Sequence, residues 1–174
     1  SENDTNYTQL NMFSNNEIGT IQDIEEISKV AKMYNIIFHT DAVQAVGNVK
    51  INVKESNIDL LSLSGHKFYA PKGVGALYVK EGIEFEKIQD GGHQEKGKRS
   101  GTENVAGIVG LAEAIKYSYK DFEYNNTKVL HLRKYFISKL KENFKGIKIN
   151  GDLEKRLPGN INVSFPNTDG GQLL

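Results

Sequence analysis

The sequence contains no cysteine among its 174 residues. Disulfides, thiolate metal sites and a cysteine nucleophile are therefore excluded within this chain. Neither sign of charge is in excess, since 22 basic side chains balance 22 acidic ones and the basic residues form no block. No apolar run approaches the roughly 20 residues of a membrane-spanning helix. We therefore predict no metal site, no membrane contact and no direct nucleic-acid binding.

The rest of the composition is typical of a soluble globular protein, with 38% hydrophobic and 25% charged residues. The length suits one domain, or one domain and part of a second, and can bury a core without disulfides. The first residue is Ser1 and not methionine, and Leu173-Leu174 follow a glycine pair like the start of a buried element. We expect a segment of a longer protein.

The first 80 residues combine helical spacing with short apolar runs. Asp23 lies three residues before Glu26, which is the spacing of a capping box. Ile24, Ile27, Ala31 and Tyr34 then recur at helical intervals, which predicts a helix that ends near Asn35. Strands are predicted within 10–18 (where a short strand precedes a loop), at 36–40, at 59–64 and at 75–79.

The second half of the sequence becomes helical after a polar loop at 90–102. Two apolar stripes at helical spacing predict two helices, with a bend at Asn125-Asn126. Half-buried strands are predicted at 147–149 and 161–165. The composition changes near residue 120, from an α/β core to a long helix and an α+β tail.

Polar side chains gather where two predicted strands end. Asp41 and Gln44 follow the first strand, and Ser64, His66 and Lys67 follow the second. Ligands of open α/β sheets bind at the carboxyl ends of strands, so these groups converge if the strands are neighbours. A lysine on a short turn can form an imine with an aldehyde cofactor, and a carboxylate opposite can keep a pyridinium nitrogen protonated. The set points to pyridoxal phosphate (PLP) chemistry.

Each of these residues alone has a simpler interpretation. Lysine is almost never fully buried, so Lys67 considered alone is predicted to be a solvated surface group. Asp41 alone could cap a helix over residues 42–46, and His66 alone is more often a structural hydrogen-bonding group. Residues 71–75 (PKGVG) resemble a phosphate-cradling loop but precede a strand, so a P-loop is excluded. Only the joint pattern favours a functional site.

That joint pattern resembles the cysteine desulfurases, a branch of the class V aminotransferase-like enzymes of PLP fold type I. The matching stretches are 15–19 (NNEIG), 39–44 (HTDAVQ), 64–67 (SGHK), 71–78 (PKGVGALY), 99–104 (RSGTEN), 150–152 (NGD) and 160–165 (NINVSF). The resemblance covers nearly the whole chain, apart from a few N-terminal residues. The implied fold is α/β: residues 1–120 form the C-terminal half of the large cofactor-binding domain, and residues 121–174 begin the α+β small domain.

The resemblance implies a role for each matching position. Lys67 is the catalytic lysine, which carries PLP and moves the substrate α-proton. Asp41 pairs with the pyridine nitrogen and Gln44 with the ring oxygen. Thr102 reaches a phosphate across a dimer interface. The full set of implied cofactor-binding residues is Asn16, Asp41, Gln44, Ser64, His66, Lys67 and Thr102.

The family reaction converts L-cysteine to L-alanine and leaves sulfur as a persulfide on an enzyme cysteine. The resemblance further implies a homodimer in the cytoplasm and a sulfur-acceptor or iron–sulfur scaffold protein as partner. The family's persulfide cysteine and carboxylate-binding arginine follow Leu174 and are absent here, so we expect no turnover by this chain alone. The alternatives are a non-catalytic scaffold module, or a relative acting on selenocysteine or another amino acid.

Overall fold

The computed structural model describes residues 7–87 and 89–172. Leu173 and Leu174, predicted to begin a buried element, lie outside this range.

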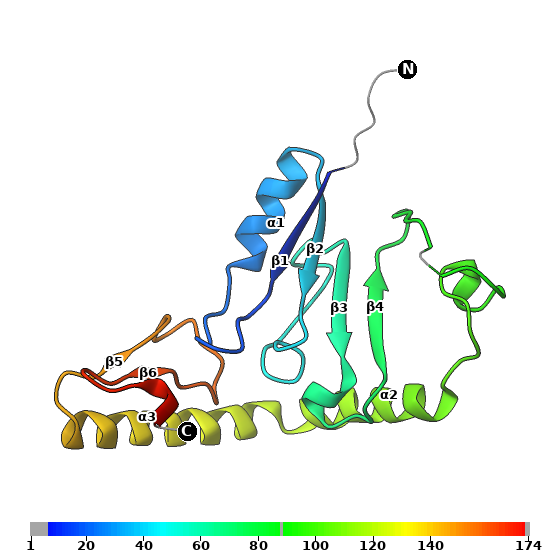
Figure 1. The fold of residues 1–174 in the computed structure, drawn as a ribbon. Helices are drawn as coiled ribbons and strands as arrows, with labels where there is room; N and C mark the ends of the chain where they lie inside the picture. Colours follow the sequence, from blue (N-terminus) through cyan, green and yellow to red (C-terminus); the bar gives the residue numbers. More distant parts are fainter. Residues whose placement is uncertain (1–6, 88, 173–174) are drawn as a thin grey trace.

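A four-stranded sheet forms the centre of the molecule (Figure 1). Its strands follow the order of the chain: β1 (Thr8–Met12), β2 (Ile37–Asp41), β3 (Leu60–Ser64) and β4 (Gly75–Val79). The first three strands are parallel, and β4 runs antiparallel to β3. The carboxyl ends of β1, β2 and β3 therefore meet at one edge, and the predicted α/β class is confirmed.

Helix α1 (Ile24–Met33) connects β1 to β2. Its N-cap is Asp23, whose side chain accepts a hydrogen bond from the Glu26 N–H at 3.4 Å. The helix ends just before Asn35, which adopts a left-handed conformation with φ 52°. Both predicted boundaries of this helix are confirmed, because local capping chemistry determines them.

One face of the sheet carries the hydrophobic core. Phe38 and Leu61 point to this face from neighbouring strands and are 1% and 4% exposed. Helix α1 contributes Ile24, and the helix that follows the sheet contributes Leu111. Because side chains alternate along a strand, the neighbours of Phe38 on β2 and of Leu61 on β3 point to the opposite face.

The opposite face of the sheet is open in this chain. Strand register aligns Met12 with Asp41 and Leu10 with His39, so these four side chains share that face. Leu10 and Met12 are both exposed, as is Leu77 on β4. The strand-borne candidate residues therefore lie on the solvent-facing side of the sheet.

Helices α2 (Val105–Lys120) and α3 (Phe122–Asn143) run end to end along the base of the sheet (Figure 1). The break falls at Asp121, whose φ and ψ are −116° and 35°. The prediction of a bend at Asn125-Asn126 is wrong, since both residues lie inside α3. Tyr119 and Phe122 stack across the break with ring centroids 5.4 Å apart, and the Tyr119 hydroxyl donates to the Val49 carbonyl at 2.9 Å.

The C-terminal region forms a separate two-stranded sheet from β5 (Lys148–Ile149) and β6 (Val163–Ser164), which are antiparallel. Both predicted strands are confirmed, although shorter than expected. Short 3₁₀ turns occur at η1 (Gly65–Phe68), η2 (Glu95–Gly97) and η3 (Gly170–Gln172). None of the helices within the described residues is long and apolar enough to cross a membrane.

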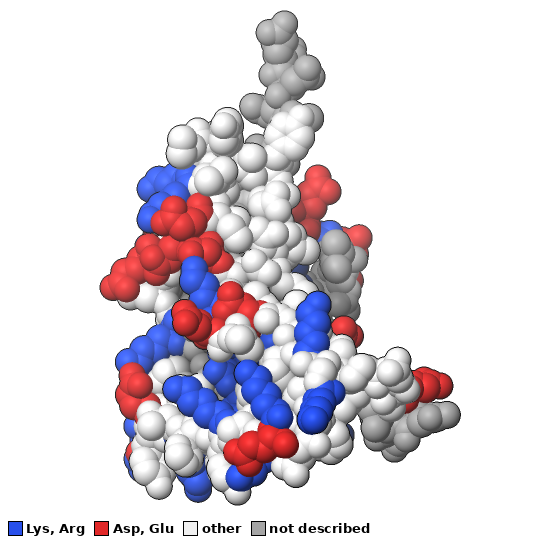
Figure 2. Space-filling model, turned by 90° about the vertical axis from the view of Figure 1, so that its left-hand side faces the viewer, with Lys and Arg blue, Asp and Glu red and all other residues white. Residues whose placement is uncertain are grey.

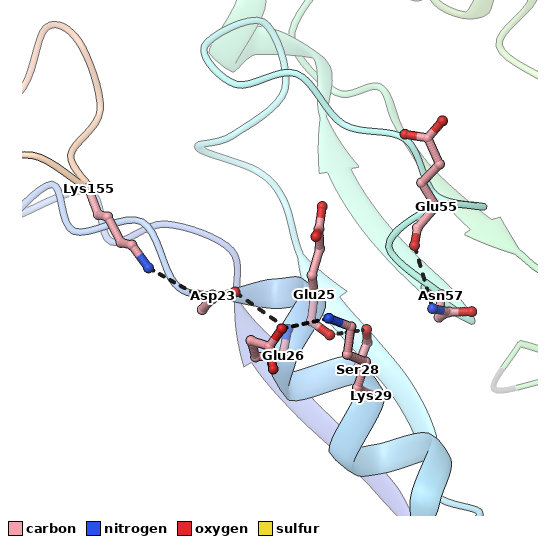
Figure 3. Close-up of polar contacts among 8 residues, drawn as sticks. All are labelled: Asp23, Glu25, Glu26, Ser28, Lys29, Glu55, Asn57 and Lys155. Carbon is pink, nitrogen blue, oxygen red and sulfur yellow. Dashed lines mark hydrogen bonds and ion pairs between the residues drawn. The ribbon is translucent and has the colours of Figure 1, made fainter.

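Charges of opposite sign lie next to each other on the side of the molecule in Figure 2. Acidic side chains gather in a band at mid-height, and basic ones gather below it, where Figure 1 places α3 and the β5–β6 region. Lys155 reaches across to Asp23 at 2.9 Å, as Figure 3 shows. This ion pair joins the C-terminal region to the start of α1. Because both side chains are about half exposed, it contributes little stability.

Candidate active site

The candidate residues follow three adjacent parallel strands at their common carboxyl edge. Asn16 lies in the loop after β1, Asp41 ends β2, and Ser64 ends β3. Asp41 is in register with Met12 on one side and Ser62 on the other. Convergence at such an edge is the arrangement expected of a ligand site in an α/β sheet.

Asp41 is half-buried and uses one carboxylate oxygen to begin a turn. Its Oδ1 accepts a hydrogen bond from the Val43 N–H at 2.9 Å. Residues 42–49 continue as successive hydrogen-bonded turns and not as a regular helix. The second carboxylate oxygen makes no hydrogen bond within the described residues, which leaves it available to a ligand. Gln44 lies in the same turns and is half-buried.

The turn that carries Lys67 is firmly held although the lysine side chain is exposed. Gly65 and Phe68 of η1 are both buried. A Cβ on Gly65 would lie 2.9 Å from both the Ala70 Cβ and a Leu111 methyl carbon. The chain then turns with the Ala70 N–H donating to the Gly65 carbonyl at 3.0 Å. A tightly packed turn thus presents a lysine whose amine makes no hydrogen bond to the described residues.

Ser64 and His66 form a polar pair beside this lysine. The Ser64 Oγ lies 2.9 Å from His66 Nδ1, within hydrogen-bonding distance. Ser64 is half-buried and His66 is exposed. One of these two groups donates to the other, and the group that accepts keeps an N–H or O–H that can donate to an oxygen of an anion.

A second hydroxyl–imidazole pair, which the sequence analysis missed, lies on the same face. His39 Nε2 and Ser62 Oγ are 2.7 Å apart, and Ser62 is in register with Asp41. Burial lowers the pKa of His39, while the nearby Asp41 charge acts in the opposite direction. The spacing of His39 and Asp41, two residues apart on one strand, places both side chains on one face, but only the register with β3 brings Ser62 beside His39.

Thr102 is the one predicted residue that the chain does not bring to this edge. It is exposed, in the loop that leads from β4 to α2, and that loop lies on the far side of β4 in Figure 1. Asn16 is also exposed, but its loop does follow the β1 end of the shared edge.

Two hollows in the surface lie away from these residues. One of about 650 Å³ lies beside α2 and is lined by Glu113, Lys116, Tyr117 and Lys120. The other, of about 250 Å³, lies near the amino ends of β2 and β3, beside Lys80 and Asp59. The candidate residues border neither hollow, so they form an open edge of the sheet in this chain.

The carboxylate that ends β2 lies beside the hydroxyl–imidazole pair and the lysine turn that follow β3, which is the arrangement of a ligand site in an α/β sheet. Residues 2–174 match the family model described as aminotransferase class V, and the chain belongs to this family. The predicted family membership is confirmed.

Within this family the chain is similar to cysteine desulfurases. It is 52% identical over 165 residues to cysteine desulfurase IscS of Clostridium botulinum (strain Hall), covering 94% of this chain and 42% of that protein. It is 49% identical over 163 residues to cysteine desulfurase IscS of Dictyoglomus turgidum, covering 94% and 41%.

Solved structures support the same relationship. The X-ray structure of a NifS-like protein from Rickettsia africae matches with a TM-score of 0.90 at 35% identity, covering 95% of this chain and 46% of that one. SspA in complex with cysteine matches with a TM-score of 0.77 at 37% identity, covering 92% and 44%. The predicted fold type is confirmed. The chain spans less than half the length of these relatives.

Proposed function

We propose that this chain is the part of a PLP-dependent cysteine desulfurase that carries the cofactor lysine. The observation that carries the proposal is the placement of Asp41 and the Lys67 turn at the carboxyl ends of neighbouring strands. The 52% identity to a cysteine desulfurase supports the choice of reaction. A scaffold module would need neither the carboxylate nor the lysine at this edge.

The chemistry of the donor set fits PLP. Lys67 offers an exposed amine for an aldehyde on a turn that packing keeps in place. Asp41 keeps one carboxylate oxygen for a ring nitrogen, because Val43 already occupies the other. Ser64 and His66 offer a paired hydroxyl and imidazole for the phosphate. Gln44 would contact the ring oxygen, and Asn16 would contact the ring or the substrate carboxylate.

When bound, PLP supplies an electron sink for the charge that develops at the substrate α-carbon. Lys67 would move the α-proton of L-cysteine, since a positioned amine can act as base and then as acid. Asp41 would hold the ring nitrogen protonated. The products would be L-alanine and sulfur, and the sulfur would pass to a cysteine outside this cysteine-free sequence.

The remaining assignments concern the whole enzyme. We propose that it is a cytoplasmic homodimer, in which Thr102 contacts the phosphate of the second copy. Exposed apolar side chains on α2 and α3 support such an interface; they include Val105, Val109, Leu132 and Phe136. Residues 1–120 would belong to the cofactor domain and residues 121–174 to the small domain. The sulfur would go to an acceptor or iron–sulfur scaffold protein.

The first experiment titrates PLP into the purified chain and records its visible absorption spectrum. We expect a band that disappears in Lys67→Ala and persists in Lys72→Ala, an exposed lysine on the neighbouring turn. A band of equal strength in Lys67→Ala would overturn the assignment of the lysine.

The second experiment tests the reaction. A chimera would place this chain in Clostridium botulinum IscS, in exchange for the 165 residues that match it. We expect the chimera to convert L-cysteine to L-alanine and its Lys67→Ala variant to lose the activity. A chimera that folds and binds PLP yet leaves L-cysteine unchanged would contradict the proposed substrate.

A further inference from the structure

The loop that carries Asn16, residues 15–20, is closed by its own hydrogen bonds. The Asn15 side-chain oxygen accepts from the backbone N–H groups of Glu17 and Ile18, both at 2.9 Å. These bonds fix the shape of the loop and leave Asn16 exposed near its tip. The antiparallel bridge between Ser14 and Ile21 closes the base of the loop directly after β1.

The C-terminal clamp, which we define as residues 150–162, fastens this loop from outside. The Leu157 N–H donates to the Gly19 carbonyl at 2.9 Å, and the Ile21 N–H donates to the Lys155 carbonyl at 2.8 Å. The two segments thus pair as short antiparallel strands around the bridge at Thr20. A segment far along the sequence therefore holds the loop from outside, in addition to the bridge at the base of the loop.

Asn160 is the clamp residue that contacts Asn16 directly. Its Nδ2 donates to the carbonyl oxygens of Asn16 and Glu17, each at 3.0 Å. Its side chain also fills the space beside Gly19, where a Cβ would lie 2.2 Å from the Asn160 Oδ1. Gly19 has φ +75°, which favours glycine in any case. The amide therefore packs against the loop backbone and bonds to it.

Arg156 determines which way the Asn160 amide points. Its Nη1 donates to Asn160 Oδ1 at 3.3 Å, and its Nε donates to the Asp152 carbonyl at 2.7 Å. Because arginine only donates hydrogen bonds, it requires the amide oxygen on its side and turns the Nδ2 toward Asn16. Arg156 is 4% exposed. The buried Arg133 of α3 braces the clamp through the Leu157 carbonyl at 2.7 Å.

We infer that Asn160, oriented by Arg156, is a positioning residue that holds Asn16 in place for its contact with cofactor or substrate. This inference rests on the role of Asn16 in the proposed function. Asn160 acts through the loop backbone and touches neither ligand itself. The clamp thereby connects the C-terminal region of the chain to the strand edge that carries Asp41 and Lys67.

The test uses Asn160→Asp, which keeps the size and the acceptor facing Arg156 but replaces the donor facing two carbonyls with an acceptor. Asn162→Asp is the matched control, because Asn162 Nδ2 donates to the Glu17 carbonyl at 3.2 Å and Asn162 makes no hydrogen bond to Asn16 among the described residues. In Asn160→Asp we expect amide hydrogens of loop 15–20 to exchange about tenfold faster, since two hydrogen bonds are lost. The same amides should change less in Asn162→Asp.

A double-mutant cycle with Asn16→Ala separates positioning from general damage. Affinity for PLP would be measured from the Lys67-dependent band, and the KM and kcat for L-cysteine in the chimera. We expect Asn160→Asp to weaken ligand binding about tenfold in the presence of Asn16 and to add almost nothing in its absence. Additive effects, or unchanged exchange in the loop, would overturn the inference.

The cycle also distinguishes this inference from the proposed function. Loss of the band in Lys67→Ala together with an Asn16→Ala variant that binds normally would leave the enzyme assignment intact. That result would overturn the inference, because there would be no contact at Asn16 to position. A band that does not depend on Lys67 would contradict the proposed function, whatever the loop does.

Discussion

Two segments that carry predicted cofactor residues, the Lys67 turn (residues 65–70) and the Thr102 loop (residues 90–104), are held in different ways. Core packing holds the turn, since Phe68 is 2% exposed and α2 lies against η1. The loop is held by its own polar bonds: the buried Ser100 hydroxyl lies 3.1 Å from the Gln89 carbonyl and 2.9 Å from the Asp90 carbonyl.

This difference indicates which parts of the site the chain organises alone. The backbone of a turn packed into the core has one position, because displacing the turn would open a cavity. A threonine on an exposed loop has a position that a second molecule could still adjust. Mutations in the turn should therefore cost stability and cofactor binding together, whereas mutations in the loop should cost the isolated chain little.

The largest expected effect is that of Phe68→Ala. Removing this ring from the core should lower the free energy of unfolding by about 3–5 kcal/mol, from lost burial and the remaining cavity. Thr102→Ala should change it by less than about 0.5 kcal/mol, as is usual for exposed sites. Urea unfolding of both variants checks the comparison, and equal losses would contradict it.

Gly65→Ala tests the tight packing of the turn more locally. The added methyl would meet Ala70 and Leu111 at 2.9 Å, so we expect a loss of about 1–3 kcal/mol from overpacking. It should also weaken the Lys67-dependent PLP band. Gly73→Ala is the control, since a Cβ there meets nothing within 4 Å and meets only the strain of φ +80°. If both variants bind PLP equally well, packing does not hold the lysine.

Thr40→Val should stabilise the protein by about 1 kcal/mol, because the buried hydroxyl is replaced by a methyl group of similar shape. Thr40 is fully buried on the core face of β2, and its Oγ1 has no hydrogen-bond partner within the described residues. Thr40→Ala should instead destabilise, since it leaves a small cavity. Thermal unfolding of both variants distinguishes the two effects.

The smallest expected effect is a pH dependence due to His39, whose pKa burial lowers below its ordinary value of 6.5 while Asp41 opposes the shift. Below that value the unfolded chain binds more protons than the folded chain, so stability should fall as the pH decreases through 6.5 toward the folded pKa. The melting temperature of His39→Gln should fall less between pH 7.5 and 5.5. The pKa values of Asp23 and Asp152 are lowered from 3.8, so these two carboxylates change the stability only near and below pH 3.8. If the melting temperatures of His39→Gln and of the unmutated chain fall equally over this pH range, the prediction is contradicted.

Local signals in the sequence accounted for most of the sheet. The Asp23 cap and the apolar runs at 36–40, 59–64 and 75–79 predicted α1 and three strands, because capping and strand burial depend on neighbouring residues. The helix break was misplaced for the opposite reason. Asn125-Asn126 look like helix breakers, yet the Asn126 side chain donates to the Asn48 carbonyl at 3.3 Å and the helix continues.

The residues of the candidate site also fall into two groups, those that local patterns predict and those that depend on distant parts of the chain. Strand-end residues such as Asp41 and Lys67 could be predicted, since the ends of parallel strands meet at one edge. Their roles toward PLP remain predictions. The His39–Ser62 pair and the Asn160 contact could not be found from local patterns, because their partners come from distant parts of the chain. Only the register of the strands and the docking of the C-terminal clamp bring them together.

The close approach of Asn160 to Gly19 has a consequence for how homologous sequences should vary. A side chain at position 19 would occupy the volume of the Asn160 amide, so the two positions cannot change independently. In homologues whose C-terminal clamp packs against the loop in this way, a residue larger than glycine at position 19 should occur together with a residue smaller than asparagine at position 160. Residues 19 and 160 should therefore covary across an alignment, despite the long stretch of sequence between them.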